Sequence, residues 1–121
     1  MDGPDSKLEF VMFRLVLIAV ALLLPSLAAA QPERRVALVI GNGAYRHAAP
    51  LRNPTRDAER MADVLRSAGV EVIFGTNLDR HAMDDRVREF GNRLEGRRVG
   101  IFFFAGHGLQ VAGENYLLPI D

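Results

Sequence analysis

The sequence predicts an α/β fold, a doubly wound parallel sheet with about four strands and two helices. Short apolar runs alternate along the chain with longer amphipathic runs. The first apolar run, "VALVI", is too short for a helix and apolar on both faces, which is typical of a buried parallel strand. The order strand, helix, strand, helix, strand implies two right-handed crossovers. At 121 residues the chain is long enough for one domain at most.

The first strand is predicted at residues 36–40, where "VALVI" ends at Gly41. The segment "NPTRDAERMADVLRSAG" then predicts a helix with Asn53 as N-cap, Pro54 in the first turn and Gly69 at its end. The residues expected on its apolar face are Ala58, Met61, Leu65 and Ala68.

A second strand is predicted for "VEVIF", residues 70–74, and ends at "GTN". Asp79 is placed to cap a second helix that closes at Gly96. Its expected apolar face consists of Met83, Val87, Phe90 and Leu94. The third strand is "VGIFFFAG", residues 99–106, and "VAGENYLLPID" predicts a turn followed by a short strand around residues 116–118.

The first thirty residues predict a signal peptide rather than part of the domain. Arg14 supplies a positive charge before an apolar run, and Ala28 and Ala30 are the small residues of a cleavage site. Cleavage after Ala30 would leave residues 31–121 as an exported domain, periplasmic or secreted.

Two alternatives concern the same segment. Met12 begins a more typical signal peptide than Met1, so the true start is expected at Met12. If cleavage does not occur, residues 15–30 would anchor the protein in a membrane. The apolar run is short for a spanning helix and ends at Pro25, which favours cleavage.

Charge and composition exclude several classes of function. Lys and Arg (15) balance Asp and Glu (15), so no basic excess predicts a nucleic-acid partner. The three histidines are scattered without ligand spacing, so no metal site is expected, and no cofactor is predicted. A nucleotide-binding protein is a weak alternative: Gly41 and Gly43 follow the first strand, but Arg46 stands where a dinucleotide fingerprint needs glycine.

His107 is the residue that the predicted topology makes conspicuous. In a doubly wound sheet the ligand crevice lies outside the carboxyl ends of the strands. If the first and third strands are neighbours, His107 faces the loop after the first strand. Gly106 and Gly108 allow a sharp turn that brings the ring and the Gly108 N–H close to a bound group. From these residues alone, His107 is either a catalytic group or a core histidine, whereas His47 and His81 are expected at the surface.

Three segments, "RRVALVIGNGAY", "LRNPTRDAERMADVL" and "GIFFFAGHGLQVAGENYLLPID", resemble the large-subunit region of caspase-like cysteine peptidases, the caspase and metacaspase superfamily. The resemblance runs from about residue 35 to residue 121. It implies an endopeptidase that hydrolyses peptide or protein substrates with a His/Cys dyad. His107 would be the general acid/base, and the Gly108 N–H would help form the oxyanion hole.

The resemblance also implies substrate-binding residues, with alternatives that stay open. In metacaspase-like members an aspartate at the place of Asp57 contributes to a pocket for Arg or Lys. Pro54 stands where many metacaspases carry cysteine. Arg52 indicates instead a pocket for an acidic residue, as in animal caspases. Asp57 has a purely structural alternative, because a carboxylate favours the positive end of its helix.

The chain contains no cysteine, although the family places its nucleophile about 50 residues after the histidine. The 121-residue chain is therefore expected to be inactive alone and its caspase-like sheet incomplete, with an apolar edge beside the third or fourth strand. One interpretation is a peptidase whose cysteine is encoded beyond residue 121. The alternative is a non-catalytic caspase-like module that binds peptide or a partner chain that completes the sheet.

Overall fold

The computed structural model describes residues 4–23, 34–96 and 99–121, and the chain divides into two units, Met1–Gln31 and Pro32–Asp121. In the first unit, α1 (Pro4–Leu23) exposes most of its described apolar side chains, among them Phe10 and Phe13. Within the described ranges, no helix is both long and apolar enough to cross a membrane. The predicted cleavage site after Ala30 lies outside the described residues, so the signal peptide stays a prediction.

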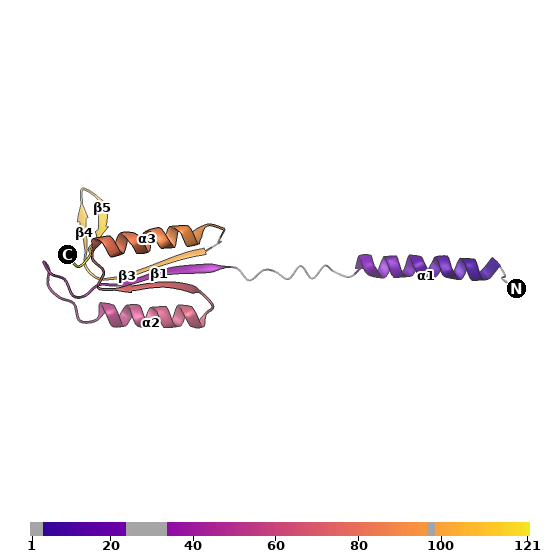
Figure 1. Ribbon diagram of the computed structural model, residues 1–121, viewed down its shortest axis with the longest axis horizontal. Helices are drawn as coiled ribbons and strands as arrows, with labels where there is room; N and C mark the ends of the chain where they lie inside the picture. The colour runs from indigo at the N-terminus through magenta and orange to yellow at the C-terminus, as the bar shows by residue number, and fades with distance from the viewer. Residues whose placement is uncertain (1–3, 24–33, 97–98) are drawn as a thin grey trace. The chain divides into compact units, whose positions relative to one another are not determined.

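The second unit is built on a three-stranded parallel sheet with the order β2-β1-β3 (Figure 1). Its strands are β1 (Arg35–Gly41), β2 (Glu71–Thr76) and β3 (Val99–Ala105). At the centre of the sheet, Leu38 lies opposite Ile73 on one side and Phe102 on the other. The parallel sheet and the neighbouring first and third strands are confirmed.

The two helices of this unit cover opposite faces of the sheet, as Figure 1 shows. On one face, Ala58 and Ala62 of α2 (Pro54–Ser67) pack against alternate residues of β1. On the opposite face, Phe90 and Leu94 of α3 (Arg80–Leu94) pack against the other set of alternating β1 residues. The β1 side chains of the α3 face are Val36, Leu38 and Ile40, all at most 1% exposed. Burial of each contributes roughly 1.5–3 kcal/mol, which explains why β1 is apolar after its first residue, the exposed Arg35.

α2 starts and ends close to the predicted residues. Asn53 occupies the N-cap, but its side chain makes no capping hydrogen bond. At the other end, Gly69 N–H donates to Arg66 O and Val70 N–H to Leu65 O, both at 3.0 Å, and Gly69 has φ +75°. This is a Schellman motif, which requires the left-handed conformation that glycine adopts without strain.

The predicted apolar faces of the two helices are wrong at one residue each. Ala68 follows the last residue of α2 and is exposed, whereas Ala62 lies in the core. Val87 of α3 is 51% exposed. Asp79 caps α3 as predicted, because its carboxylate accepts a hydrogen bond from Ala82 N–H at 2.8 Å.

The end of the chain forms a β-hairpin where the sequence predicted one short strand. β4 (Gly108–Val111) and β5 (Glu114–Leu117) pair antiparallel across Ala112 and Gly113. These two residues have φ 51° and 85°, which is the two-residue turn that fits the twist of a hairpin. The described sheet and hairpin thus hold five strands instead of about four. β3 is an edge strand of the described sheet, and its Phe102 is 50% exposed.

Candidate active site

The site lies at the carboxyl edge of the sheet, between β1 and β3. β2 and β3 flank β1 on opposite sides, and α2 and α3 cover opposite faces, so the strand order reverses between β1 and β3, the point where open α/β sheets bind ligands. Asn42 N–H donates to Ala105 O at 2.8 Å and extends the pairing to the last residue of β3. His107 follows two residues later, beside the loop after β1.

The imidazole of His107 is half-buried and its Nε2 lies 2.8 Å from the carbonyl oxygen of Ala49. A carbonyl oxygen only accepts hydrogen bonds, so Nε2 must carry the hydrogen. In a neutral imidazole this leaves the lone pair on Nδ1. The loop after β1 therefore selects one tautomer of His107, in which Nδ1 is the basic atom.

Tyr45 supports His107 from the same loop. The Tyr45 hydroxyl accepts a hydrogen bond from His107 N–H at 2.7 Å and donates one to Leu118 O at 3.2 Å. The two rings are 4.6 Å apart between centroids, at an angle of 51°. Burial raises the pKa of the Tyr45 phenol, and the hydrogen bond from the His107 backbone offsets this only in part.

The two glycines beside His107 have different roles. A Cβ on Gly106 would lie 2.5 Å from the Tyr45 hydroxyl and 2.8 Å from the Phe104 ring, so no larger residue fits there. Leu118 N–H donates to His107 O at 3.0 Å, so the next pair of the hairpin, Gly108 opposite Leu117, is a non-hydrogen-bonded pair. The Gly108 N–H consequently points away from β5.

Asn42 joins the segments around the site, although the sequence pattern predicted no role for it. It is fully buried; its Oδ1 accepts from Leu78 N–H at 2.9 Å, and its Nδ2 donates to Leu118 O at 3.2 Å. Nearby, Asn77 Oδ1 accepts from the N–H groups of Gly43 and Ala44, both at 3.0 Å. A polar residue directly after the apolar residues 36–41 was the available signal, because a buried amide needs partners.

The predicted substrate-binding residues lie at the same edge of the sheet. Arg52 is in the loop after β1 and Asp57 in the first turn of α2, and both side chains are exposed. Among the residues that the structure describes, none makes a hydrogen bond or ion pair with either side chain. His47 and His81 are exposed, as predicted.

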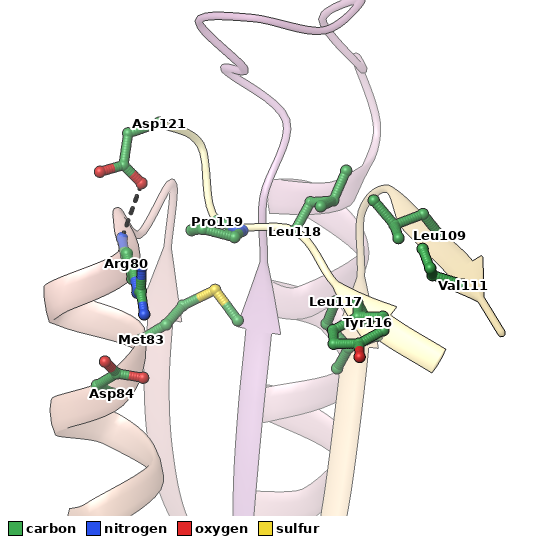
Figure 2. A pocket seen from close by; sticks show the side chains of 10 residues that line it. All are labelled: Arg80, Met83, Asp84, Leu109, Val111, Tyr116, Leu117, Leu118, Pro119 and Asp121. Atoms are coloured by element: carbon green, nitrogen blue, oxygen red, sulfur yellow. Dashed lines mark hydrogen bonds between the residues drawn. The ribbon is translucent and has the colours of Figure 1, made fainter. Parts of the chain in front are cut away.

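A groove of about 750 Å³ lies between the first turn of α3 and the hairpin (Figure 2). Its walls are mostly apolar, and Arg80, Asp84 and Asp121 supply the charged residues. Figure 2 shows Arg80 N–H hydrogen-bonded to Asp121 Oδ1, at 2.9 Å. His107 does not line this groove. Leu118 connects the groove with the His107 site, because its side chain lines the groove and its backbone N–H donates to His107 O. In the described part of the chain, no cluster of His, Cys, Asp or Glu could hold a metal ion.

Comparison with known proteins gives one family and two relatives. Residues 34–121 match the caspase domain family. The chain is 32% identical over 87 residues to human mucosa-associated lymphoid tissue lymphoma translocation protein 1, covering 72% of this chain and 11% of that protein. It is 31% identical to the homologue from Mus musculus, covering 72% and 10%. The chain thus spans about a tenth of the length of these relatives.

Proposed function

The chain belongs to the caspase domain family, and from this membership we propose that it carries the histidine half of a cysteine endopeptidase site. The observation that supports the proposal most directly is the Nε2 contact of His107 with Ala49 O at 2.8 Å. This contact leaves a basic Nδ1 at the carboxyl edge of the sheet. A His/Cys dyad needs an imidazole ring fixed in place with a free lone pair, and this contact supplies both.

The proposed reaction is acyl transfer. Nδ1 of His107 takes the proton of a thiol, and the thiolate attacks the carbonyl carbon of the scissile peptide bond. The Gly108 N–H stabilises the oxyanion, because a main-chain donor fixed in place need not reorganise. The imidazolium then returns the proton to the leaving amine as the C–N bond breaks. Water hydrolyses the thioester and regenerates the thiol.

The thiol is the component that these 121 residues do not contain, since the sequence holds no cysteine. We place it in a segment or partner chain that adds to the sheet beside β3, whose outer edge is unpaired in the described sheet. The chain alone should not cleave peptides, whereas peptide binding does not need the thiol.

The substrate class is a peptide or protein, and the charged residues at the edge of the site set its preference. The exposed Asp57 carboxylate favours a peptide with Arg or Lys at the cleaved position, and Arg52 favours an acidic one. Because exposed ion pairs contribute about 0.2–1 kcal/mol, each preference is expected to be only a few-fold in affinity.

Peptide binding is tested by NMR on the labelled 121-residue chain. A capped peptide ending in Arg should shift the signals of the His107 ring and the Gly108 amide. Asp57→Asn should weaken binding of this peptide a few-fold and leave binding of a matched peptide ending in Asp unchanged. Arg52→Gln should weaken binding of the peptide ending in Asp and leave binding of the peptide ending in Arg unchanged. No shift at His107 with either peptide would count against the proposal.

Hydrolysis is tested by reading the source DNA beyond codon 121. If a cysteine follows another apolar strand within about 50 residues of His107, the longer chain should cleave peptides. His107→Ala should remove that activity while leaving the fold intact. A folded longer chain that contains the cysteine and cleaves no peptide would refute the proposal.

A non-catalytic caspase-like module is the second candidate, and the unpaired outer edge of β3 in the described sheet favours it, because a partner chain could pair there. Such a module would bind peptide, or a partner chain along β3, without chemistry at His107. His107→Ala would then leave its function in the host unchanged, which separates the two candidates.

We also propose that residues 1–30 direct export, with residues 15–30 as a membrane anchor if they are not removed. The apolar run after Arg14, which ends at Pro25 and is followed by Ala28 and Ala30, supports this, because it has the pattern of a cleavable targeting segment. Mass spectrometry of the exported protein should find an N-terminus at Gln31. A mature protein that begins at Met1 or Met12 would contradict cleavage.

A further inference from the structure

The Tyr45 hydroxyl occupies a place where a main-chain hydrogen bond would ordinarily lie. Leu118 N–H donates to His107 O at 3.0 Å, one of the two bonds of a hydrogen-bonded antiparallel pair. In a regular pair, His107 N–H would donate back to Leu118 O. It donates instead to the Tyr45 hydroxyl at 2.7 Å, which donates in turn to Leu118 O at 3.2 Å. The hydroxyl is thus inserted between the two segments at the base of the hairpin.

Two further contacts make this insertion specific to Tyr45. The centroid of its ring lies 4.6 Å from that of the His107 imidazole. The same imidazole is held from another side by the contact of its Nε2 with Ala49 O. Gly106 has no room for a Cβ because the Tyr45 hydroxyl would lie 2.5 Å from it. One side chain, 9% exposed, therefore contacts the backbone and the ring of His107 and the residue before it.

The peptide unit that follows His107 carries the Gly108 N–H, so the backbone position of His107 determines where this N–H points. Both main-chain groups of His107 are engaged, the N–H by Tyr45 and the C=O by Leu118. A direct bond from His107 N–H to Leu118 O would bring the two segments closer at this point, because the inserted oxygen would no longer separate them. The following peptide would then turn, and with it the direction of the Gly108 N–H.

We propose that Tyr45 is a positioning residue: its hydroxyl, inserted between His107 and Leu118, sets the direction of the Gly108 N–H, and its ring keeps the His107 imidazole in its orientation. The proposal rests on the proposed function for its catalytic meaning. It adds a residue that acts through His107 and Gly108 and touches no substrate.

The experiment compares the parent chain with Tyr45→Phe and Tyr45→Leu by ¹⁵N NMR, about two pH units above the usual imidazole pKa. In the parent, His107 should be held as the Nε2–H tautomer, while the exposed His47 and His81 serve as internal references. Tyr45→Phe keeps the ring contact and removes the hydroxyl. It should shift the Gly108 amide signal and speed hydrogen exchange at the His107 amide about tenfold. Tyr45→Leu should in addition mix the tautomers of His107.

A matched control separates positioning from stability. Asp79→Ala removes the cap of α3 and should lower stability by about 1 kcal/mol, leaving the His107 tautomer and the Gly108 amide unchanged. Unchanged His107 and Gly108 signals in Tyr45→Phe and Tyr45→Leu, with a stability loss like that of the control, would overturn the proposal. A failure of peptide binding would remove the proposed endopeptidase role, yet the response of His107 to the Tyr45 variants would still be measured.

Discussion

Asn42→Ala should destabilise the second unit by about 1.5–4.5 kcal/mol. The substitution removes the acceptor of Leu78 N–H, at 2.9 Å, and a donor to Leu118 O, at 3.2 Å. Leu118 O keeps its bond from Tyr45, so the loss there is about 0.5–1.5 kcal/mol. Leu78 N–H loses its partner, and an unsatisfied buried donor costs about 1–3 kcal/mol. Together these losses give the stated range.

The assay is urea and thermal unfolding of the 121-residue chain. For a domain of this size the melting temperature should fall by roughly 4–8 °C for each kcal/mol. The matched control is Asn92→Ala, which removes the same side chain from an exposed position in α3 and should change stability by less than about 0.5 kcal/mol. Equal stabilities of the two variants would refute the reasoning that the Asn42 amide bonds hold these segments.

Asn42→Asp tests the same contacts through pH. The carboxylate still accepts from Leu78 N–H, but it meets the Leu118 carbonyl with no hydrogen to donate. Burial disfavours the charged form and would raise the pKa of the new carboxyl in the folded state. A group with a raised folded pKa contributes its stability below the unfolded pKa and loses it as pH rises through the folded pKa. The variant should therefore approach the parent in acid and fall behind it towards neutral pH; a gap independent of pH would contradict this.

Three further predictions concern single positions. Gly41→Ala should destabilise by about 2 kcal/mol or more in urea unfolding, because its Cβ would lie 2.3 Å from the carbonyl oxygen of Pro54. Gly91→Ala should instead stabilise by about 0.5–1 kcal/mol, since it lies inside α3 with open space around it; a loss in this variant would show that its surroundings are not open. Because burial raises the pKa of Tyr45, stability should be full below the unfolded tyrosine pKa of about 10 and fall as pH rises through the folded pKa. Tyr45→Phe should lack this alkaline fall, and an equal fall in both proteins would assign it to other groups.

Most of the fold follows from local pattern in the sequence. The apolar run of β1 predicted a strand buried on both faces, and α2 and α3 now cover those two faces. Asp79 and Gly69 marked helix ends because capping and left-handed turns depend on the residue itself. The hairpin was predicted only in part, since β4 and β5 are four residues each and have every residue exposed. Such strands leave no clear alternation of buried and exposed residues in the sequence.

The sequence by itself determined the parallel sheet, the place of His107 after β3 and the glycines around it. Only the tertiary structure decided what holds His107 there. Tyr45 lies 62 positions before it, and Ala49, whose carbonyl oxygen selects its tautomer, lies 58 positions before it. A main-chain carbonyl carries no mark of its role in the sequence, and a tyrosine after a strand has many possible partners. The contacts exist because parallel pairing of β1 with β3 brings the two carboxyl ends to one edge of the sheet.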